Sequence, residues 1–170
     1  MPRNPAPTEV DCYIYIKEEL KKSGWDTRNP ELFSPGQVVT QNECLSNPEI
    51  KKLLGLDKPE NIVKIDESSL WVIEAKSKQS MLNQAVSEAK QYAKKINKSK
   101  RLQTKFITAV ASNNHESFIV KTYFFHQEKY SLVKLNDVEA TGFLSPEQTE
   151  YRDLTIIGTK NGAKKNHIHL

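Results

Sequence analysis

The feature that most constrains this chain is a pair of short β-rich runs that lie close together. Residues 62–65 are Ile-Val-Lys-Ile, residues 70–73 are Leu-Trp-Val-Ile, and the polar tetrad 66–69 separates them. Runs of β-branched and aromatic residues on both sides of a short polar turn predict a β-hairpin. The second run is almost continuously apolar, which is typical of a strand covered on both faces. We therefore expect this hairpin inside a sheet that other elements cover.

Helical patterns occur on both sides of the hairpin. Thr8 can cap a helix that begins with the acids of Glu9-Val10-Asp11, which suit its positive N-terminal dipole, and that ends near Gly24. Residues 80–97 form the clearest helix, because one apolar stripe recurs along them. A short helix is expected over residues 49–54, after the capping pair Asn-Pro.

The order of the elements predicts an α/β protein. A helix, a hairpin, a second helix and further strands suit a three-layer α/β/α arrangement with a central mixed sheet. The remaining expected elements are strands at 37–41, 106–110, 118–125 and 130–135 and a short capped helix starting at Ser145.

The length of 170 residues predicts one domain with a sizeable core. We expect that domain to cover residues 8–157. The proline-rich residues 1–7 are expected to be disordered, and residues 158–170 are expected to form a flexible basic tail.

Composition narrows the class of protein without giving a function. The hydrophobic fraction of 37% and the charged fraction of 27% are ordinary for a soluble protein. No apolar run approaches the roughly 20 residues that span a membrane, and the N-terminus does not resemble a signal peptide, so we expect a cytoplasmic protein. The net charge of +4 is compatible with a polyanionic partner. Cys12 and Cys44 are predicted to be reduced structural thiols.

Three charged residues flank the predicted hairpin at its open end. Glu60 precedes the first strand, and Glu74 and Lys76 end the second. Since the start of one hairpin strand lies beside the end of the other, we expect the two carboxyl groups to be close. Side chains alternate along a strand, so Glu74 and Lys76 should share one face, about 6–7 Å apart.

Two neighbouring carboxylates raise each other's pKa unless a cation neutralises them. Mg²⁺ is the usual cation where phosphate is the substrate, and the backbone carbonyl of Ala75 offers a further oxygen ligand. Lys76 would orient or deprotonate a water molecule, or stabilise charge on phosphorus. The alternative is a solvated surface ion pair, because Glu-x-Lys is a common tripeptide. Asp66 is the alternative second acid, although a hairpin turn places it poorly.

These residues resemble a known motif. Pro59-Glu60 followed by Glu74-Ala75-Lys76 resembles the PD-(D/E)xK nuclease motif, and the wider frame resembles the N-terminal nuclease domain of type I restriction enzyme R subunits. The similarity covers roughly residues 8–125. The segments that carry it are the first helix with Gly24-Trp25, the strand 71–76, the helix with Gln84-Ala85 and residues 88–93, and the strand 106–110.

The resemblance implies a restriction-endonuclease-like fold and a Mg²⁺-dependent DNA endonuclease of restriction–modification type, with Mn²⁺ as a substitute. It implies Glu60 and Glu74 as metal ligands and Lys76 as the catalytic lysine. Glu9 would line the same cavity; its alternative role is to interact with the helix dipole. The implied partners are double-stranded DNA and the motor, specificity or methylation subunits of a restriction system. No Gly-rich phosphate loop occurs, so we expect no ATPase motor in this chain.

The helix after the lysine supplies the candidates for substrate contact. They are Gln84, Gln91 and Tyr92, for which solvent exposure (the glutamines) and core packing (the tyrosine) are the alternatives. Lys78 begins a basic stretch that extends to Arg101 and would neutralise DNA phosphates, or form a solvated face.

Two residues depart from the family pattern. Glu60 replaces the usual aspartate, and Glu88 replaces a frequent glutamine. These departures keep two alternatives open: a catalytically inactive nuclease-like domain that binds nucleic acid or protein, and a structural α/β domain with a coincidental Glu-x-Lys.

Overall fold

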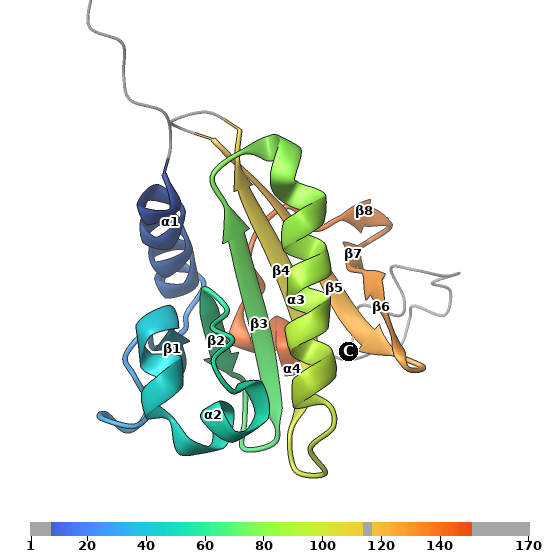
Figure 1. The fold of residues 1–170 in the computed structure, drawn as a ribbon. Helices are drawn as coiled ribbons and strands as arrows, with labels where there is room; N and C mark the ends of the chain where they lie inside the picture. Colours follow the sequence, from blue (N-terminus) through green and yellow to red (C-terminus); the bar gives the residue numbers. More distant parts are fainter. Residues whose placement is uncertain (1–7, 114–116, 151–170) are drawn as a thin grey trace, which may run out of the picture.

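A computed structural model describes residues 8–113 and 117–150 of the chain (Figure 1). Its centre is a six-stranded mixed sheet of order β1-β2-β3-β4-β5-β6. β3 and β4 run parallel, and the other neighbouring strands of this sheet are antiparallel. The strands are β1 (Val38–Thr40), β2 (Asn61–Lys64), β3 (Ser69–Lys76), β4 (Gln103–Ser112), β5 (Phe118–His126) and β6 (Lys129–Leu132).

The predicted hairpin is confirmed as β2 and β3. These strands pair in register from Asn61 opposite Ile73 to Lys64 opposite Leu70. In the turn, the Asp66 carboxylate accepts the backbone N–H of Ser68 at 2.9 Å. Local side-chain bonding of this kind is the reason that Asp and Ser favour turns.

Helices cover both faces of the sheet, as the α/β/α prediction requires. Along β3, Trp71, Ile73 and Ala75 pack in one core cluster with α1 (Glu9–Lys22). Leu70 and Val72 point the other way and pack in a second cluster with residues of α2 (Pro48–Leu54) and α3 (Leu82–Ile96). In Figure 1, α3 crosses in front of the sheet, and it carries the chain from β3 to the parallel β4.

The boundaries of α1 follow the predicted signals. Thr8 and Asp11 form a reciprocal capping box at its start. At its end, Gly24 has a φ of 108°, a conformation that glycine adopts without the steric cost paid by other residues. The following Trp25 is buried, and its indole N–H donates to the backbone oxygen of Leu144 at 2.8 Å. This bond attaches the end of the helix to the segment before α4 (Pro146–Glu150).

Other boundaries differ from the predicted ones. The segment 130–135 is not a single strand: β6 ends at Leu132, and β7 (Lys134–Leu135) pairs instead with β8 (Val138–Glu139). The cause is a tight turn between β7 and β8, in which Asn136 and Asp137 have positive φ angles. Residues 79–81 and 41–46 form the 3-10 helices η2 (Gln79–Met81) and η1 (Gln41–Ser46), which the sequence did not predict.

Three predictions concern the ends of the chain. The predicted disordered start at 1–7, the end of the domain at 151–157 and the tail at 158–170 lie outside the described residues. Within the described residues, no helix is both long and apolar enough to span a membrane.

Candidate active site

Glu60 and Glu74 meet at the open end of the hairpin. Because Asn61 faces Ile73 in the antiparallel register, the next pair along is Glu60 and Glu74. The backbone N–H of Glu60 donates to Oε1 of Glu74 at 3.3 Å, and both side chains are buried, with exposed fractions of 7% and 5%. The geometry expected from the hairpin is therefore present in the fold.

Lys76 lies two residues further along β3 and meets α3. Its Nζ forms an ion pair with Oε1 of Glu88 at 3.0 Å, and 16% of the lysine side chain is exposed. The side-chain amide of Gln84, one turn earlier on the helix, donates to the other oxygen of Glu88 at 2.8 Å. Glu88 thus holds the ammonium on the side of the sheet that Glu74 also faces.

Burial dominates the electrostatics of Glu74. Desolvation raises the pKa of its carboxyl group to about 7, although the hydrogen bond from the Ala75 N–H at 3.1 Å acts in the opposite direction. The negative charges of Glu88 and Glu60 raise this pKa further, whereas the positive charge of Lys76 lowers it. The site therefore disfavours a second uncompensated negative charge.

Tyr92 connects α3 to the same carboxyl group. It is partly buried against the cluster of α2 and α3, which agrees with the core-packing alternative. Burial raises the pKa of its phenol, and so do the charges of Glu74 and Glu88 and a hydrogen bond to Glu74. The side chain thus both packs in the core and contacts the site.

The other candidates are placed as follows. Ala75 is buried with its side chain on the opposite face, towards α1, while its backbone N–H bonds to Glu74. Gln91 and Lys78 are exposed, on α3 and just before η2 respectively. Glu9 is the first residue of α1, and its side chain lies outside the described part of the structure. Asp66 is exposed in the turn at the far end of the hairpin, so it cannot replace Glu60.

One neighbour of the site was not anticipated from the sequence. The thiol of Cys12 on α1 donates to the backbone oxygen of Lys76 at 3.4 Å. This contact brings α1 to the end of β3 from the face opposite Glu88. A buried cysteine in an apolar helix face gives no signal in the sequence that would reveal such a contact.

No protein-family model, curated protein or solved structure matches this chain. The resemblance to the PD-(D/E)xK motif is therefore supported by residues of this chain alone and by no related protein.

The residues at the site fit a divalent cation by their chemistry. Glu60 and Glu74 supply hard carboxylate oxygens, which Mg²⁺ prefers, and burial penalises their two negative charges unless a cation offsets them. In the geometry described for residues 8–113 and 117–150, no group of three or more His, Cys, Asp or Glu residues is arranged to hold a metal. A metal here would therefore need ligands of another kind, such as the Ala75 carbonyl, water or phosphate oxygens.

Proposed function

We propose that this chain is a metal-dependent DNA endonuclease with a restriction-endonuclease-like fold. The observation that supports this most strongly is the meeting of Glu60, Glu74 and Lys76 at the open end of one hairpin, with both acids buried. A surface ion pair needs no second buried carboxyl group beside it. The connection of the parallel strands β3 and β4 through α3 also agrees with the proposed fold.

In this proposal Mg²⁺ would be held by Glu60, Glu74 and the backbone carbonyl of Ala75, and Mn²⁺ would substitute for it. The bound ion would activate water and neutralise charge that develops on the phosphate. Lys76 orients the attacking water or stabilises the negative charge on phosphorus. For either role its ammonium group must leave Glu88 and contact the substrate instead. Tyr92 holds the Glu74 carboxyl group in place through its hydroxyl.

The proposed substrate is double-stranded DNA, and the proposed setting is a cytoplasmic restriction system. Gln84, Gln91 and Lys78 would lie along the approach of the DNA, and motor, specificity or methylation subunits would be partner chains. The exposed lysines of α3 supply charge for phosphate contacts.

The first prediction tests the catalytic role of Lys76. Purified protein should nick or linearise plasmid DNA with Mg²⁺ or Mn²⁺, and EDTA should abolish cleavage. Lys76→Ala should lower the cleavage rate at least about 100-fold, because loss of a group that stabilises transition-state charge typically costs two to three powers of ten. Lys52→Ala, which removes an exposed lysine of α2, is the control and should cleave like the wild type.

Cleavage that survives Lys76→Ala would show that the activity arises elsewhere. A second candidate function is a nuclease-like domain that binds nucleic acid without cutting it. The ion pair of Lys76 with Glu88 favours this alternative, since it engages the amine that catalysis needs. In that case the wild type would retain oligonucleotides in a binding assay and leave plasmid intact under every metal condition.

A further inference from the structure

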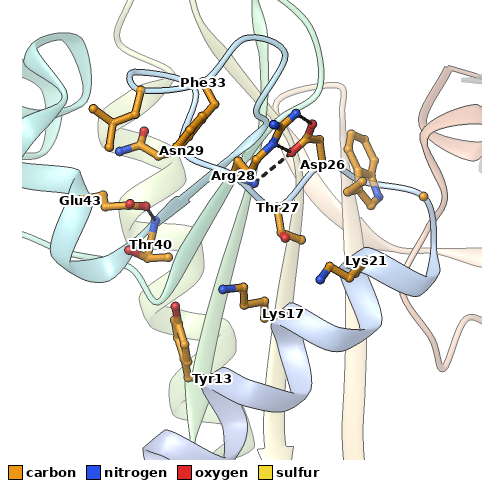
Figure 2. Close-up of a pocket in the computed structure, with 13 residues that line it drawn as sticks. Tyr13, Lys17, Lys21, Asp26, Thr27, Arg28, Asn29, Phe33, Thr40 and Glu43 are labelled. Carbon is orange, nitrogen blue, oxygen red and sulfur yellow. Dashed lines mark hydrogen bonds and ion pairs between the residues drawn. The ribbon is translucent and has the colours of Figure 1, made fainter.

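A large hollow lies between α1 and the loop that follows it (Figure 2). Its volume is about 680 Å³, within the range of small-ligand pockets. One wall is α1, and the other is formed by residues of the loop 24–33 and by the ends of β1 and η1 that meet there. The hollow is separate from the candidate active site, because α1 packs on the face of β3 that carries Trp71 and Ile73, whereas Glu74 points to the other face.

Two lysines of α1 bring positive charge to this hollow. Lys17 and Lys21 are one helical turn apart, both are exposed, and both extend towards the hollow in Figure 2. Among the described residues neither ammonium group pairs with a carboxylate, whereas the adjacent Lys22 pairs with Glu19 at 3.0 Å. Like charges four residues apart on a helix repel each other. An anion bound between the two lysines would therefore remove an unfavourable interaction.

The other charged groups of the lining already have partners. The Asp26 carboxylate accepts hydrogen bonds from the Arg28 guanidinium at 2.9 and 2.6 Å. The guanidinium carbon also lies 5.5 Å from the centre of the Phe33 ring, so Arg28 covers that ring. The Glu43 carboxylate accepts the backbone N–H of Thr40 at 2.9 Å. The two lysines are therefore the charged groups of the lining that remain available to a ligand.

A buried amide lies on the wall opposite the lysines. Asn29 lines the hollow and is 8% exposed, and Figure 2 shows it on the loop, across from Lys17 and Lys21. Its Oδ1 accepts the backbone N–H of Glu31 at 3.0 Å, while its Nδ2 has no hydrogen-bond partner among the described residues. A buried donor without a partner is costly. A ligand that reaches this wall with an acceptor oxygen would satisfy it.

These groups suit a small organic phosphate. A phosphate monoester carries a charge of about −1.5 to −2 near pH 7 and three acceptor oxygens, so it can contact two ammonium groups at once, whereas a carboxylate carries a single charge. The volume of about 680 Å³ is much larger than an inorganic phosphate ion and leaves room for an organic body. Hydroxyl oxygens on that body can accept the amide hydrogens of Asn29.

We propose that this hollow binds a phosphate monoester of the size of a phosphorylated sugar. Its phosphate group lies between Lys17 and Lys21, and a hydroxyl oxygen of its organic body accepts a hydrogen bond from Asn29. The site is independent of the proposed nuclease function, because it lies on the other face of the sheet.

Isothermal titration calorimetry tests the ligand class, with ribose 5-phosphate, inorganic phosphate and ribose as probes in a phosphate-free buffer at pH 7.5 and about 0.15 M salt. We expect ribose 5-phosphate to bind saturably with a dissociation constant below about 1 mM. Inorganic phosphate should bind at least about fivefold more weakly, because it lacks the body that reaches Asn29. Ribose alone should not bind measurably.

The lysine variants test the anion contacts. Lys17→Gln/Lys21→Gln should weaken binding of both phosphate probes at least about tenfold, because it removes two charge-assisted hydrogen bonds. The matched control Lys51→Gln/Lys52→Gln removes the same charge from exposed positions on α2 and should bind like the wild type.

A third variant tests the amide. Asn29→Asp keeps an acceptor for the backbone N–H of Glu31 and replaces the Nδ2 donor with an oxygen of a negatively charged group. It should weaken ribose 5-phosphate at least about tenfold and inorganic phosphate much less. Asn83→Asp makes the same chemical change at an exposed position of α3 and is the control.

The outcomes are distinct from those of the nuclease experiments. Absence of saturable ribose 5-phosphate binding by the wild type, or equal losses in the two double-lysine variants, would overturn this inference and leave plasmid cleavage untouched. Equal affinities for ribose 5-phosphate and inorganic phosphate would identify a simple anion site and overturn the assignment of an organic ligand. Thermal unfolding of each variant shows that it is folded, and the lysine variants decide the question if Asn29→Asp is not.

Discussion

At the scale of single residues, the raised pKa of the Glu74 carboxyl group is a property of the site that can be measured. Its carboxyl group is buried beside Glu60 and Glu88, and burial raises its pKa from 4.5 to about 7. A carboxyl group whose pKa is higher in the folded state binds its proton more tightly there than in the unfolded chain. Its contribution to stability is therefore complete below pH 4.5 and is lost as the pH rises through 7.

This linkage gives a prediction for the metal-free protein. In EDTA, the wild type should lose up to about 3 kcal/mol of unfolding free energy between pH 4.5 and pH 8, since each unit of pKa shift corresponds to about 1.4 kcal/mol. Glu74→Gln replaces the protonated carboxyl group with a neutral amide, so its stability should stay nearly constant over the same interval. Urea denaturation at a series of pH values measures both. An equal decline in the variant would assign the pH dependence to other groups.

At the scale of elements, hydrogen-bonded side chains connect three neighbouring strands. The indole N–H of the fully buried Trp71 on β3 donates to the hydroxyl of Thr108 on β4 at 2.8 Å, and this hydroxyl is 2.8 Å from that of Thr122 on β5. The strand β3 also carries Glu74 and Lys76, so this chain of polar atoms fixes the strand that positions the candidate site.

Breaking this series of hydrogen bonds should destabilise the fold, whereas the same substitution at a similar position on β4 should not. Thr108→Val leaves the indole N–H and the Thr122 hydroxyl without their shared partner in the core, which should destabilise the fold by about 1–3 kcal/mol. Thr104 is the matched control: it is equally buried on β4, and its hydroxyl has no hydrogen-bond partner among the described residues. Thr104→Val should therefore be neutral or stabilising. Equal thermal shifts in the two variants would contradict this assignment.

Features of the fold could be predicted from the sequence where the residues that determine them lie close together in the chain. The hairpin and α1 were predicted because turn residues and a capping box, such as Thr8 with Asp11, lie within a few positions of each other. The approach of Glu60 to Glu74 was predicted because the hairpin register fixes it. The cavity between α1 and the loop after it was not predicted, since Lys17 and Phe33 come to line one hollow only when the chain after α1 folds back.

At the scale of the whole molecule, the candidate site lies where separate layers meet. Glu60 comes from the segment before β2, Glu74 and Lys76 from β3, Glu88 and Tyr92 from α3, and Cys12 from the opposite layer. These groups are distant in the sequence and come together only in the folded protein. A cation bound among them would therefore stabilise the fold as a whole, because the unfolded chain offers no comparable site.

The stability of the whole fold should consequently respond to divalent cations. At neutral pH, Mn²⁺ at about ten times its dissociation constant should stabilise the protein by about 1.4 kcal/mol, which raises the melting temperature of a chain of this size by about 3–6 °C. The variants Glu60→Gln and Glu74→Gln should lose most of this shift. Asp66→Asn is the control, because it removes an exposed acid from the far end of the same hairpin and should keep the full shift. A rise in melting temperature that is equal in all three variants would mean that Mn²⁺ binds elsewhere, and the carboxyl pair would then have no role as a metal site.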